Sequence, residues 1–207
     1  MDKNINNNGY DYVDLELPSG TLWATMNVGA SSPSESGLYF QWGEIKGYTK
    51  EQIGKEKKFE YDFSDYKFSI DGSNTNFSKY IKEGAISELE DDAAHVNMGG
   101  IWHMPTPDQI SELIYNTTSE WVELDGVNGR LFTSNKDTSK SIFIPAAGGA
   151  MDGSVFTNGY DGFAWSSMLS TILVGYGQSI YFNSEYIYLS YNFFSRCNGF
   201  PVRGVIG

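Results

Sequence analysis

The two histidines and the single cysteine of this chain are its best candidates for metal, acid–base or nucleophilic chemistry. Asp91 and His95 are four positions apart, so on a helix they would face one side and could share a metal ion. A metal site would need at least one further ligand from elsewhere in the chain. The alternative is ordinary helix chemistry, with acidic residues in the first turn and a histidine in the last. We favour this alternative and expect no metal site.

The remaining chemical candidates are interpreted as structural. His103 lies between Trp102 and Met104, and we expect a packed, hydrogen-bonded residue rather than a catalytic base. Cys197 follows Arg196 in an otherwise uncharged run, which favours a small packed residue over a nucleophile. A lone cysteine forms no intramolecular disulfide and no cysteine-based zinc cluster. Neither a nucleophile elbow nor a phosphate-binding loop is present. We expect no catalytic residue and no cofactor, although a glycosidase-like carboxylate pair stays open.

Residues 71–76, DGSNTN, are similar to part of a calcium-binding loop. The distal glutamate that such a loop requires is missing at the necessary spacing. We therefore favour a solvated turn.

The segment from Met168 to the end has an unusual composition. Its only charged residues are Glu185, Arg196 and Arg203, whereas charged residues make up 19% of the whole chain. Tyrosine and phenylalanine are mixed with asparagine and serine, which is typical of antibody combining sites. Bulky residues fall on both faces of the expected strands, which indicates either burial on two sides or an exposed patch. Composition alone leaves these two readings equally favoured.

We interpret part of this segment as a ligand-binding surface for a protein or glycan on a cell surface. Rigid aromatic rings supply contact area at low entropic cost, and short polar side chains adapt their hydrogen bonds. The candidate contact residues are Tyr176, Tyr181, Asn183, Tyr186, Tyr188, Tyr191, Asn192, Phe193, Phe194 and Ser195.

The whole-chain composition predicts a globular domain. The 207 residues are 40% hydrophobic and 15% aromatic, and the formal net charge is −12. That charge disfavours binding to nucleic acid or to anionic lipid. No run of 18 apolar residues and no apolar leader is present, so neither membrane insertion nor export is predicted. A trimmed secreted protein or a phage-particle protein would look the same.

The expected elements give a single α+β domain over residues 10–207, after a flexible leader at 1–9. A hairpin is expected at 11–28, because Val13, Leu15 and Leu17 alternate with acidic residues before a turn. Residues 46–86 have poor periodicity and are interpreted as a divergent insertion lying over the core. Residues 168–197 are the putative variable binding region. Further strands are expected around 121–124, 130–133, 141–145, 163–167, 179–182, 186–189 and 200–205. Between the first two of these, either Asp125-Gly126 or Asn128-Gly129 could make a hairpin turn.

Two helices are expected between the insertion and these strands. Ser87 and Glu90 have the spacing of a capping box, with Leu89, Ala93 and Val96 on one face and Gly99-Gly100 at the end. The second helix has a stronger start signal, because Thr106 is an expected N-cap, Pro107 sits at the first helical position and Gln109 completes the box. Its expected buried stripe is Ile110, Leu113 and Ile114.

Several segments, taken in order, resemble the Fibrobacter succinogenes major paralogous domain family. They span nearly the whole chain and leave residues 46–86 and the run after Ser167 as the divergent parts. The resemblance implies a C-type-lectin-like fold without disulfides, with two main helices and mixed, mostly antiparallel sheets, related to formylglycine-generating domains. Those oxidases need reactive cysteines, so their activity is not carried over to a chain with Cys197 alone. The matching segments are residues 12–15, 17–25, 27–30, 39–44, 91–94, 102–106, 144–148, 165–167 and 198–203.

The run after Ser167 is similar to the variable region of proteins diversified by retroelements, of which a phage tropism determinant is a relative. In such proteins only template adenines are randomised, so an asparagine codon never yields Lys, Glu, Gln, Met or Trp. Met168, Gln178 and Glu185 fall outside the permitted set. The residues that fit it are Tyr188, Tyr191, Asn192, Phe193, Phe194, Ser195 and Cys197.

The leading hypothesis is therefore a display module, an adhesin or receptor-binding protein on a cell surface or phage particle, without catalysis. Two alternatives stay open. One is an enzyme of the hydrolase or formylglycine-generating type, and the other is a structural subunit whose aromatic patch forms an interface. An ordinary, non-diversified member of the family also stays open.

Overall fold

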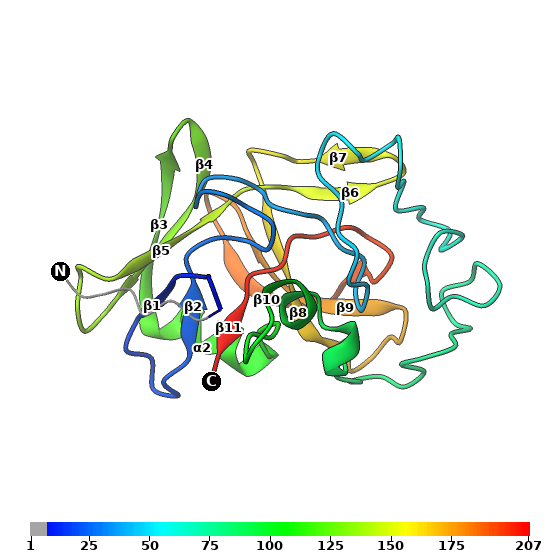
Figure 1. Ribbon diagram of the computed structural model, residues 1–207, viewed down its shortest axis with the longest axis horizontal. Coiled ribbons are helices and arrows are strands. Elements are labelled where there is room, and N and C mark those ends of the chain that lie inside the picture. The colour runs from blue at the N-terminus through cyan, green and yellow to red at the C-terminus, as the bar shows by residue number, and fades with distance from the viewer. Residues whose placement is uncertain (1–7) are drawn as a thin grey trace.

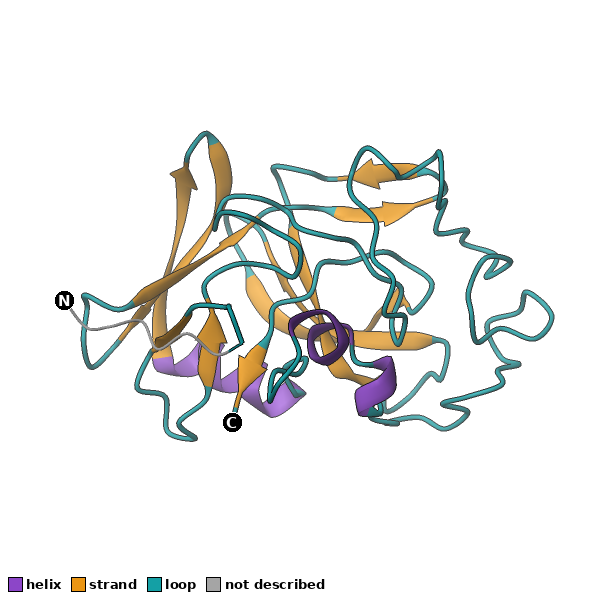
Figure 2. Cartoon of the chain, in the orientation of Figure 1, coloured by secondary structure: helices purple, strands orange, loops and turns teal. Residues whose placement is uncertain are grey.

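The computed structural model describes residues 8–207, and most of the predicted leader, residues 1–7, lies outside the described residues (Figures 1 and 2). The described chain is mostly β-sheet with two α-helices, and its cysteine is free, in agreement with the predicted α+β class. The elements in order are β1 (Tyr12–Asp14), β2 (Leu22–Ala24), the 3-10 helix η1 (Leu89–Asp91), α1 (Ala93–Met98), α2 (Pro107–Asn116), β3 (Thr117–Leu124), β4 (Val127–Ser134), β5 (Ser141–Pro145), β6 (Gly149–Met151), β7 (Ser154–Phe156), β8 (Gly162–Leu169), β9 (Tyr176–Phe182), β10 (Ile187–Ser195) and β11 (Val205–Ile206).

The strands form small antiparallel sheets that surround a shared interior. Their orders are β1-β2-β11, β3-β4-β5, β8-β9-β10 and β6-β7. In the first sheet the last strand of the chain pairs with β2, so the two ends of the domain lie side by side (Figure 1). Figure 1 shows the β3-β4-β5 sheet at one end of the molecule and the long loops of residues 46–86 at the other.

The predicted hairpins form, with shorter strands at the N-terminus. β1 pairs with β2, but Glu16 adopts a positive φ of 55° and ends the extended run after Asp14. β3 and β4 are joined at Asp125-Gly126, whose φ values of 51° and 80° are those of the tight turn that suits a two-residue hairpin. The second predicted turn, Asn128-Gly129, is part of β4 instead.

The predicted start of the first helix is wrong. Ser87 caps nothing, and its hydroxyl is buried without a hydrogen-bond partner among the described residues. The N-cap is Asp92, whose carboxylate accepts hydrogen bonds from the backbone N–H of His95 at 2.9 Å and of Met104. Leu89 and Val96, expected on the buried face, are exposed, and Ala93, Ala94 and Met98 face the interior. The sequence pattern failed here because the helix is a short one that begins only after a 3-10 turn.

The predicted features of the second helix are confirmed. Thr106 is the N-cap, Pro107 occupies the first turn, and Thr106 and Gln109 form the reciprocal capping box. Ile110 and Leu113 are fully buried against the β8-β9-β10 sheet, in a cluster with Ala164, Ile180 and Leu189.

Residues 46–86 contain neither an α-helix nor a strand of the sheets, yet they contribute to the core (Figure 2). Phe63, Tyr66 and Phe77 are buried and contact one another through ring edges, at centroid distances of 5.8–6.2 Å. The guanidinium of the fully buried Arg196, directly after β10, lies 3.4 Å from the centre of the Phe77 ring. These rings enter the core from a segment without helix or strand, so their spacing in the sequence follows no helical or strand period.

Candidate ligand-binding surface

The candidate residues lie on strands β9 and β10 and in the turn that joins them, and β10 is one edge of the β8-β9-β10 sheet. Opposite residues on antiparallel strands point to the same face. The row Ala164, Ile180 and Leu189 faces α2 and is buried. The next row, Phe163, Tyr181 and Tyr188, faces the other way and passes from the core to the surface.

Four aromatic side chains of the segment are exposed. The exposed fractions are 60% for Tyr186, 41% for Tyr188, 52% for Tyr191 and 69% for Phe193. Burial in the sheet would have hidden these rings, so the structure supports the exposed patch over the two-sided core. Such grouping of large exposed rings is uncommon on a monomer without a binding role.

A β-bulge places two of these rings. Ser190 pairs with Ser179 and Phe194 pairs with Gly177, so residues 191–193 of β10 lie opposite Gln178 alone. The unpaired residues leave the regular ladder, and the strand bends there. Tyr191 and Phe193 therefore project from an interruption in the edge strand rather than from a flat sheet.

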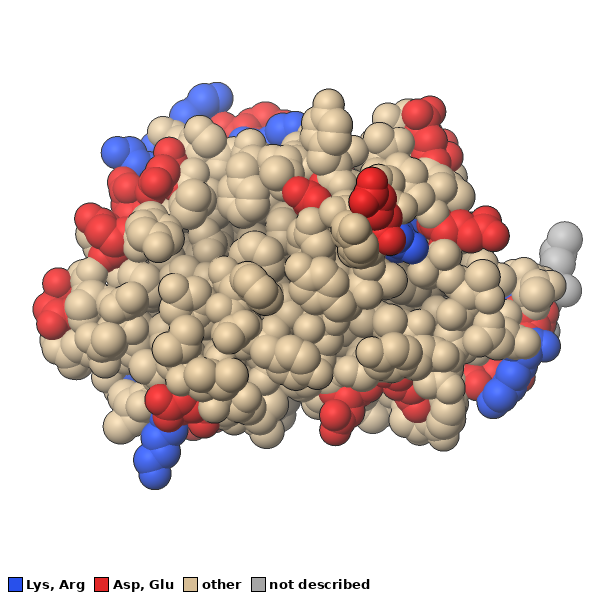
Figure 3. Space-filling view, turned by 180° about the vertical axis from the view of Figure 1, so that it is seen from behind, with Lys and Arg blue, Asp and Glu red and all other residues tan. Residues whose placement is uncertain are grey.

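The surface around the segment carries little charge. From Met168 to the end, Arg196 and Arg203 are fully buried, so Glu185 is the one exposed charged residue. Seen from behind, the molecule presents a broad uncharged area with acidic and basic side chains around its edges (Figure 3). An uncharged area favours contacts through rings and hydrogen bonds over electrostatic attraction.

Two predicted contact residues belong to the interior. Ser195 is buried, and its hydroxyl lies 3.1 Å from the Cys197 sulfur. Phe194 is only partly buried, but its ring packs against Phe163 at 4.9 Å and against Phe200 at 5.2 Å. Neighbouring residues of a strand point to opposite faces, so both faces of the sheet are covered at this end of β10, which the composition of the segment did not reveal.

Tyr181 and Asn183 support the surface. The Tyr181 hydroxyl donates to the Asp161 carboxylate at 2.9 Å and accepts from the Asn183 amide at 2.9 Å. The side-chain carbonyl oxygen of Asn183 accepts hydrogen bonds from the backbone N–H groups of Glu185 and Tyr186, which closes the turn before β10. Burial, with the hydrogen bond to Asp161, raises the pKa of Tyr181 to about 12. Tyr181 also carries the exposed Tyr188 ring, at a centroid distance of 5.0 Å.

The remaining candidates are Tyr176 and Asn192, both partly exposed. Sequence reasoning missed Ile172 and Leu173, which are 62% and 44% exposed in the loop between β8 and β9. This loop lies at the same end of the sheet as Phe194, because Leu169, Gly177 and Phe194 share one row of the ladder. The available signal was an apolar pair that no strand pattern required.

A metal site shared by Asp91 and His95, the reading that the sequence disfavoured, finds no support in their positions. Asp91 belongs to η1 rather than to the helix, and its carboxylate is bound by Lys67 at 2.7 Å and Lys79 at 2.5 Å. Although burial works against it, the hydrogen bonds of Lys67, Lys79 and Tyr80 hold the pKa of Asp91 below its usual value. His95 instead lies with Nδ1 3.1 Å from the Trp102 carbonyl. The favoured alternative was right for the histidine, because His95 lies in the last turn of α1, and wrong for the acids, because α1 has no acidic residue in its first turn.

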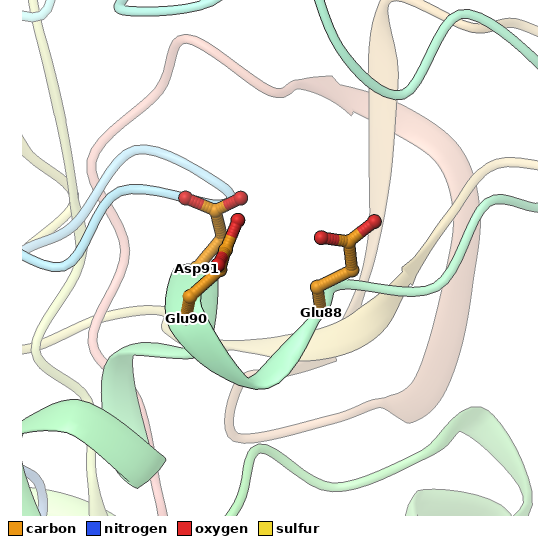
Figure 4. Close-up of side chains that lie close together, drawn as sticks. All are labelled: Glu88, Glu90 and Asp91. Atoms are coloured by element: carbon orange, nitrogen blue, oxygen red, sulfur yellow. The ribbon is translucent and has the colours of Figure 1, made fainter.

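Three neighbouring carboxylates, of Glu88, Glu90 and Asp91, lie close together (Figure 4). The Lys79 ammonium contacts all three, at 2.8, 2.9 and 2.5 Å. The Lys79 ammonium, with Lys67 on Asp91, already supplies positive charge among these carboxylates, so the cluster is explained without a metal.

The other chemical candidates have structural partners. Burial raises the pKa of the Cys197 thiol to about 11, which leaves it protonated and unreactive at neutral pH. His103 has Nδ1 2.8 Å from the Met104 carbonyl. The carboxylate of Asp71 accepts hydrogen bonds from Ser73 and Asn76, so residues 71–76 form the predicted surface turn.

Among residues 8–207, no helix has the length and apolar character needed to cross a membrane. Comparisons of the chain with protein-family models, with curated proteins and with solved structures found no match. The functional assignment therefore depends on the chemistry of this surface.

Proposed function

We propose that the chain is a ligand-binding display module, an adhesin or receptor-binding protein, that binds a protein or glycan through the aromatic side of β10. The observation that carries the proposal is the exposure of Tyr188, Tyr191 and Phe193 on the edge strand β10, together with Tyr186 in the turn just before it. Rings of this kind, surrounded by short polar groups, are the usual anchors of binding surfaces.

The fold proposed for this module is the disulfide-free C-type-lectin-like fold of the Fibrobacter succinogenes major paralogous domain family. Support comes from the way the resembling segments interlock. The Trp42 indole donates to the Ser166 carbonyl at 2.9 Å, and the Trp165 indole donates to the Phe40 carbonyl at 2.8 Å. The Arg203 guanidinium donates to the Asn27 side chain at 2.9 Å. These contacts make the resembling segments a scaffold that is separate from the exposed rings.

Diversification by a retroelement is part of the proposal. Tyr188, Tyr191 and Phe193 fit the adenine code and are exposed, whereas Gln178, which does not fit, is buried and donates to the Leu169 carbonyl. Sequencing of the neighbouring DNA tests this part. A near-identical downstream repeat that differs only at adenines, beside a reverse transcriptase, is expected, and its absence would make the chain a non-diversified member.

A binding screen against purified glycans and cell-surface proteins tests the function. The unaltered chain is expected to bind at least one member, and Tyr188→Ala is expected to weaken that binding at least about tenfold, as for an aromatic anchor. The matched control is Tyr115→Ala. Tyr115 is 81% exposed but lies on α2, which covers the opposite face of the sheet from Tyr188. Equal losses in both variants, or no loss in either, would contradict the proposal.

A further inference from the structure

A hollow of about 320 Å³ lies where residues 61–74 meet the β8-β9-β10 sheet. One wall consists of Tyr176 at the start of β9 and Ser195 at the end of β10, and both were candidate contact residues. The other wall contains Tyr61 and Asp62, which no pattern in the sequence singled out, and Asn74, which belongs to the turn at residues 71–76. The hollow therefore adjoins the aromatic surface of β10 and extends it onto the insertion.

The two walls are held against each other by close packing. A Cβ atom on Gly175 would come within 2.6 Å of the Asn74 carbonyl oxygen, so only glycine permits this approach of the two backbones. The backbone N–H of Arg196 donates to the Gly175 carbonyl at 3.0 Å, and its guanidinium donates to the Tyr80 carbonyl at 2.9 Å. The strand, the loop and the insertion thus form one preorganised unit, which lowers the entropic cost of binding.

The polar groups at the rim have spare hydrogen-bonding capacity. The side-chain amide of Asn74 and the hydroxyls of Tyr61 and Tyr176 make no hydrogen bond with any of residues 8–207. The Asp62 carboxylate accepts hydrogen bonds from Ser64, from its backbone N–H at 3.0 Å and from its side chain, and a carboxylate has further lone pairs that can accept from a ligand. Phe63, which is buried, provides an apolar floor.

The polar rim and the apolar floor of the hollow together indicate which class of ligand it would bind. The described lining contains no lysine, arginine or histidine, and its one charged group is acidic, so phosphates and carboxylates are disfavoured. A purely apolar ligand would strip water from the carboxylate and the amide without replacing their hydrogen bonds. A sugar ring satisfies both requirements, because its hydroxyls donate and accept while its C–H face packs on an aromatic ring. The volume lies at the lower end of the usual range for small-molecule sites, about 300–1,000 Å³.

We propose that the hollow between residues 61–74 and Tyr176 is a subsite for one neutral sugar ring of a glycan whose remainder lies along β10. The inference rests on the proposed function and names its ligand class. Tyr61 supplies the stacking face, Asn74 and the Tyr176 hydroxyl bind ring hydroxyls, and Asp62 accepts from one of them.

Saturation-transfer NMR with a panel of neutral methyl hexosides and N-acetylhexosaminides tests the subsite directly. At least one of these sugars is expected to bind with a Kd on the order of 1–10 mM, the range for a small ligand with few contacts. Tyr61→Ala and Asn74→Ala are each expected to weaken that binding at least about tenfold. Both residues are exposed, so the melting temperature of each variant is expected to stay unchanged. Absence of binding across the panel, or binding that neither variant alters, would overturn the subsite.

A crossed control separates this inference from the proposed function. Tyr188 lies outside the hollow. Tyr188→Ala is therefore expected to leave the binding of single sugars unchanged and to weaken the binding of the complete ligand. If Tyr188→Ala loses binding of the complete ligand and no single sugar binds the unaltered chain, the display function is retained and the subsite is rejected. Sugar binding that depends on Tyr61, with no effect of Tyr188 on any complete ligand, would retain the subsite and remove the role of β10.

Discussion

Tyr188 and Phe194 lie on the same strand and have opposite roles. Tyr188 is 41% exposed and rests on Tyr181, whereas Phe194 packs against Phe163 and Phe200. Their residue types are nearly equivalent, so only the register of β10 and its bulge separate a contact residue from a core residue. A composition-based prediction therefore found the segment and could not choose among its aromatic rings.

Cys197 gives a test at the residue scale. Because burial raises its pKa to about 11, only about one thiol in a thousand is ionised at pH 8 in the folded protein. Alkylation by iodoacetamide at pH 8 is expected to be at least about a hundredfold slower for the native chain than for the chain in urea. Mass spectrometry measures both rates. Comparable rates would mean that the thiol is accessible and that this part of the core is assigned incorrectly.

At the scale of elements, the helices show where a sequence pattern is reliable. The signals for α2 agree with one another: an N-cap, a proline, a glutamine and a periodic apolar stripe. The signal for α1 was a single serine–glutamate spacing, and the structure uses Asp92 instead because its carboxylate also binds the Met104 backbone. That second hydrogen bond joins the start of α1 to the segment after the helix, and a pattern of neighbouring residues cannot predict it.

Paired alanine variants test the two caps. Thr106→Ala removes a side chain that accepts from the Gln109 backbone, so a loss of about 1 kcal/mol in the free energy of unfolding is expected. Ser87→Ala removes a buried hydroxyl without a partner among the described residues and is expected to cost less than about 0.5 kcal/mol. Urea unfolding of both variants checks this. A larger loss for Ser87→Ala than for Thr106→Ala would restore the predicted capping box.

The presence of most strands was predicted, but the residues at which they end were not. The apolar residues of 121–124 and 130–133 predicted parts of β3 and β4, and Asp125-Gly126 was one of the two dipeptides expected to make the turn between them. The extension of β10 through Tyr191 to Ser195 was not predicted, because the bulge interrupts the alternation on which the prediction depends. The bulge also limits pairing of this edge with another strand.

At the scale of the whole molecule, residues 46–86 link the core to the proposed site. Their rings fill the interior beside Arg196, while their surface residues form one wall of the hollow. The sequence indicated an insertion because periodicity was lost, but it gave no sign that the segment supplies core side chains. Packing between residues distant in sequence, such as Phe77 and Arg196, carries no local signature.

Substitution within this segment tests that assignment. Phe77→Ala removes a buried ring and is expected to lower the free energy of unfolding by about 3–5 kcal/mol. Tyr61→Ala, in the same segment but 59% exposed, is expected to change it by less than about 0.5 kcal/mol. Urea unfolding compares the two. Equal, small effects would mean that residues 46–86 lie on the core without contributing to it.

The central claim is that β10 carries a binding surface on which the stability of the domain does not depend. Its most direct test combines a thermal melt with a titration of the ligand found by screening, for the triple variant Tyr188→Ala, Tyr191→Ala, Phe193→Ala. Phe194→Ala serves as the core control, with an expected loss of about 2 kcal/mol or more. The triple variant is expected to lose binding by at least about a hundredfold while its Tm stays near that of the unaltered chain. Unchanged binding, or a fall in Tm as large as that of the Phe194 control, would contradict it.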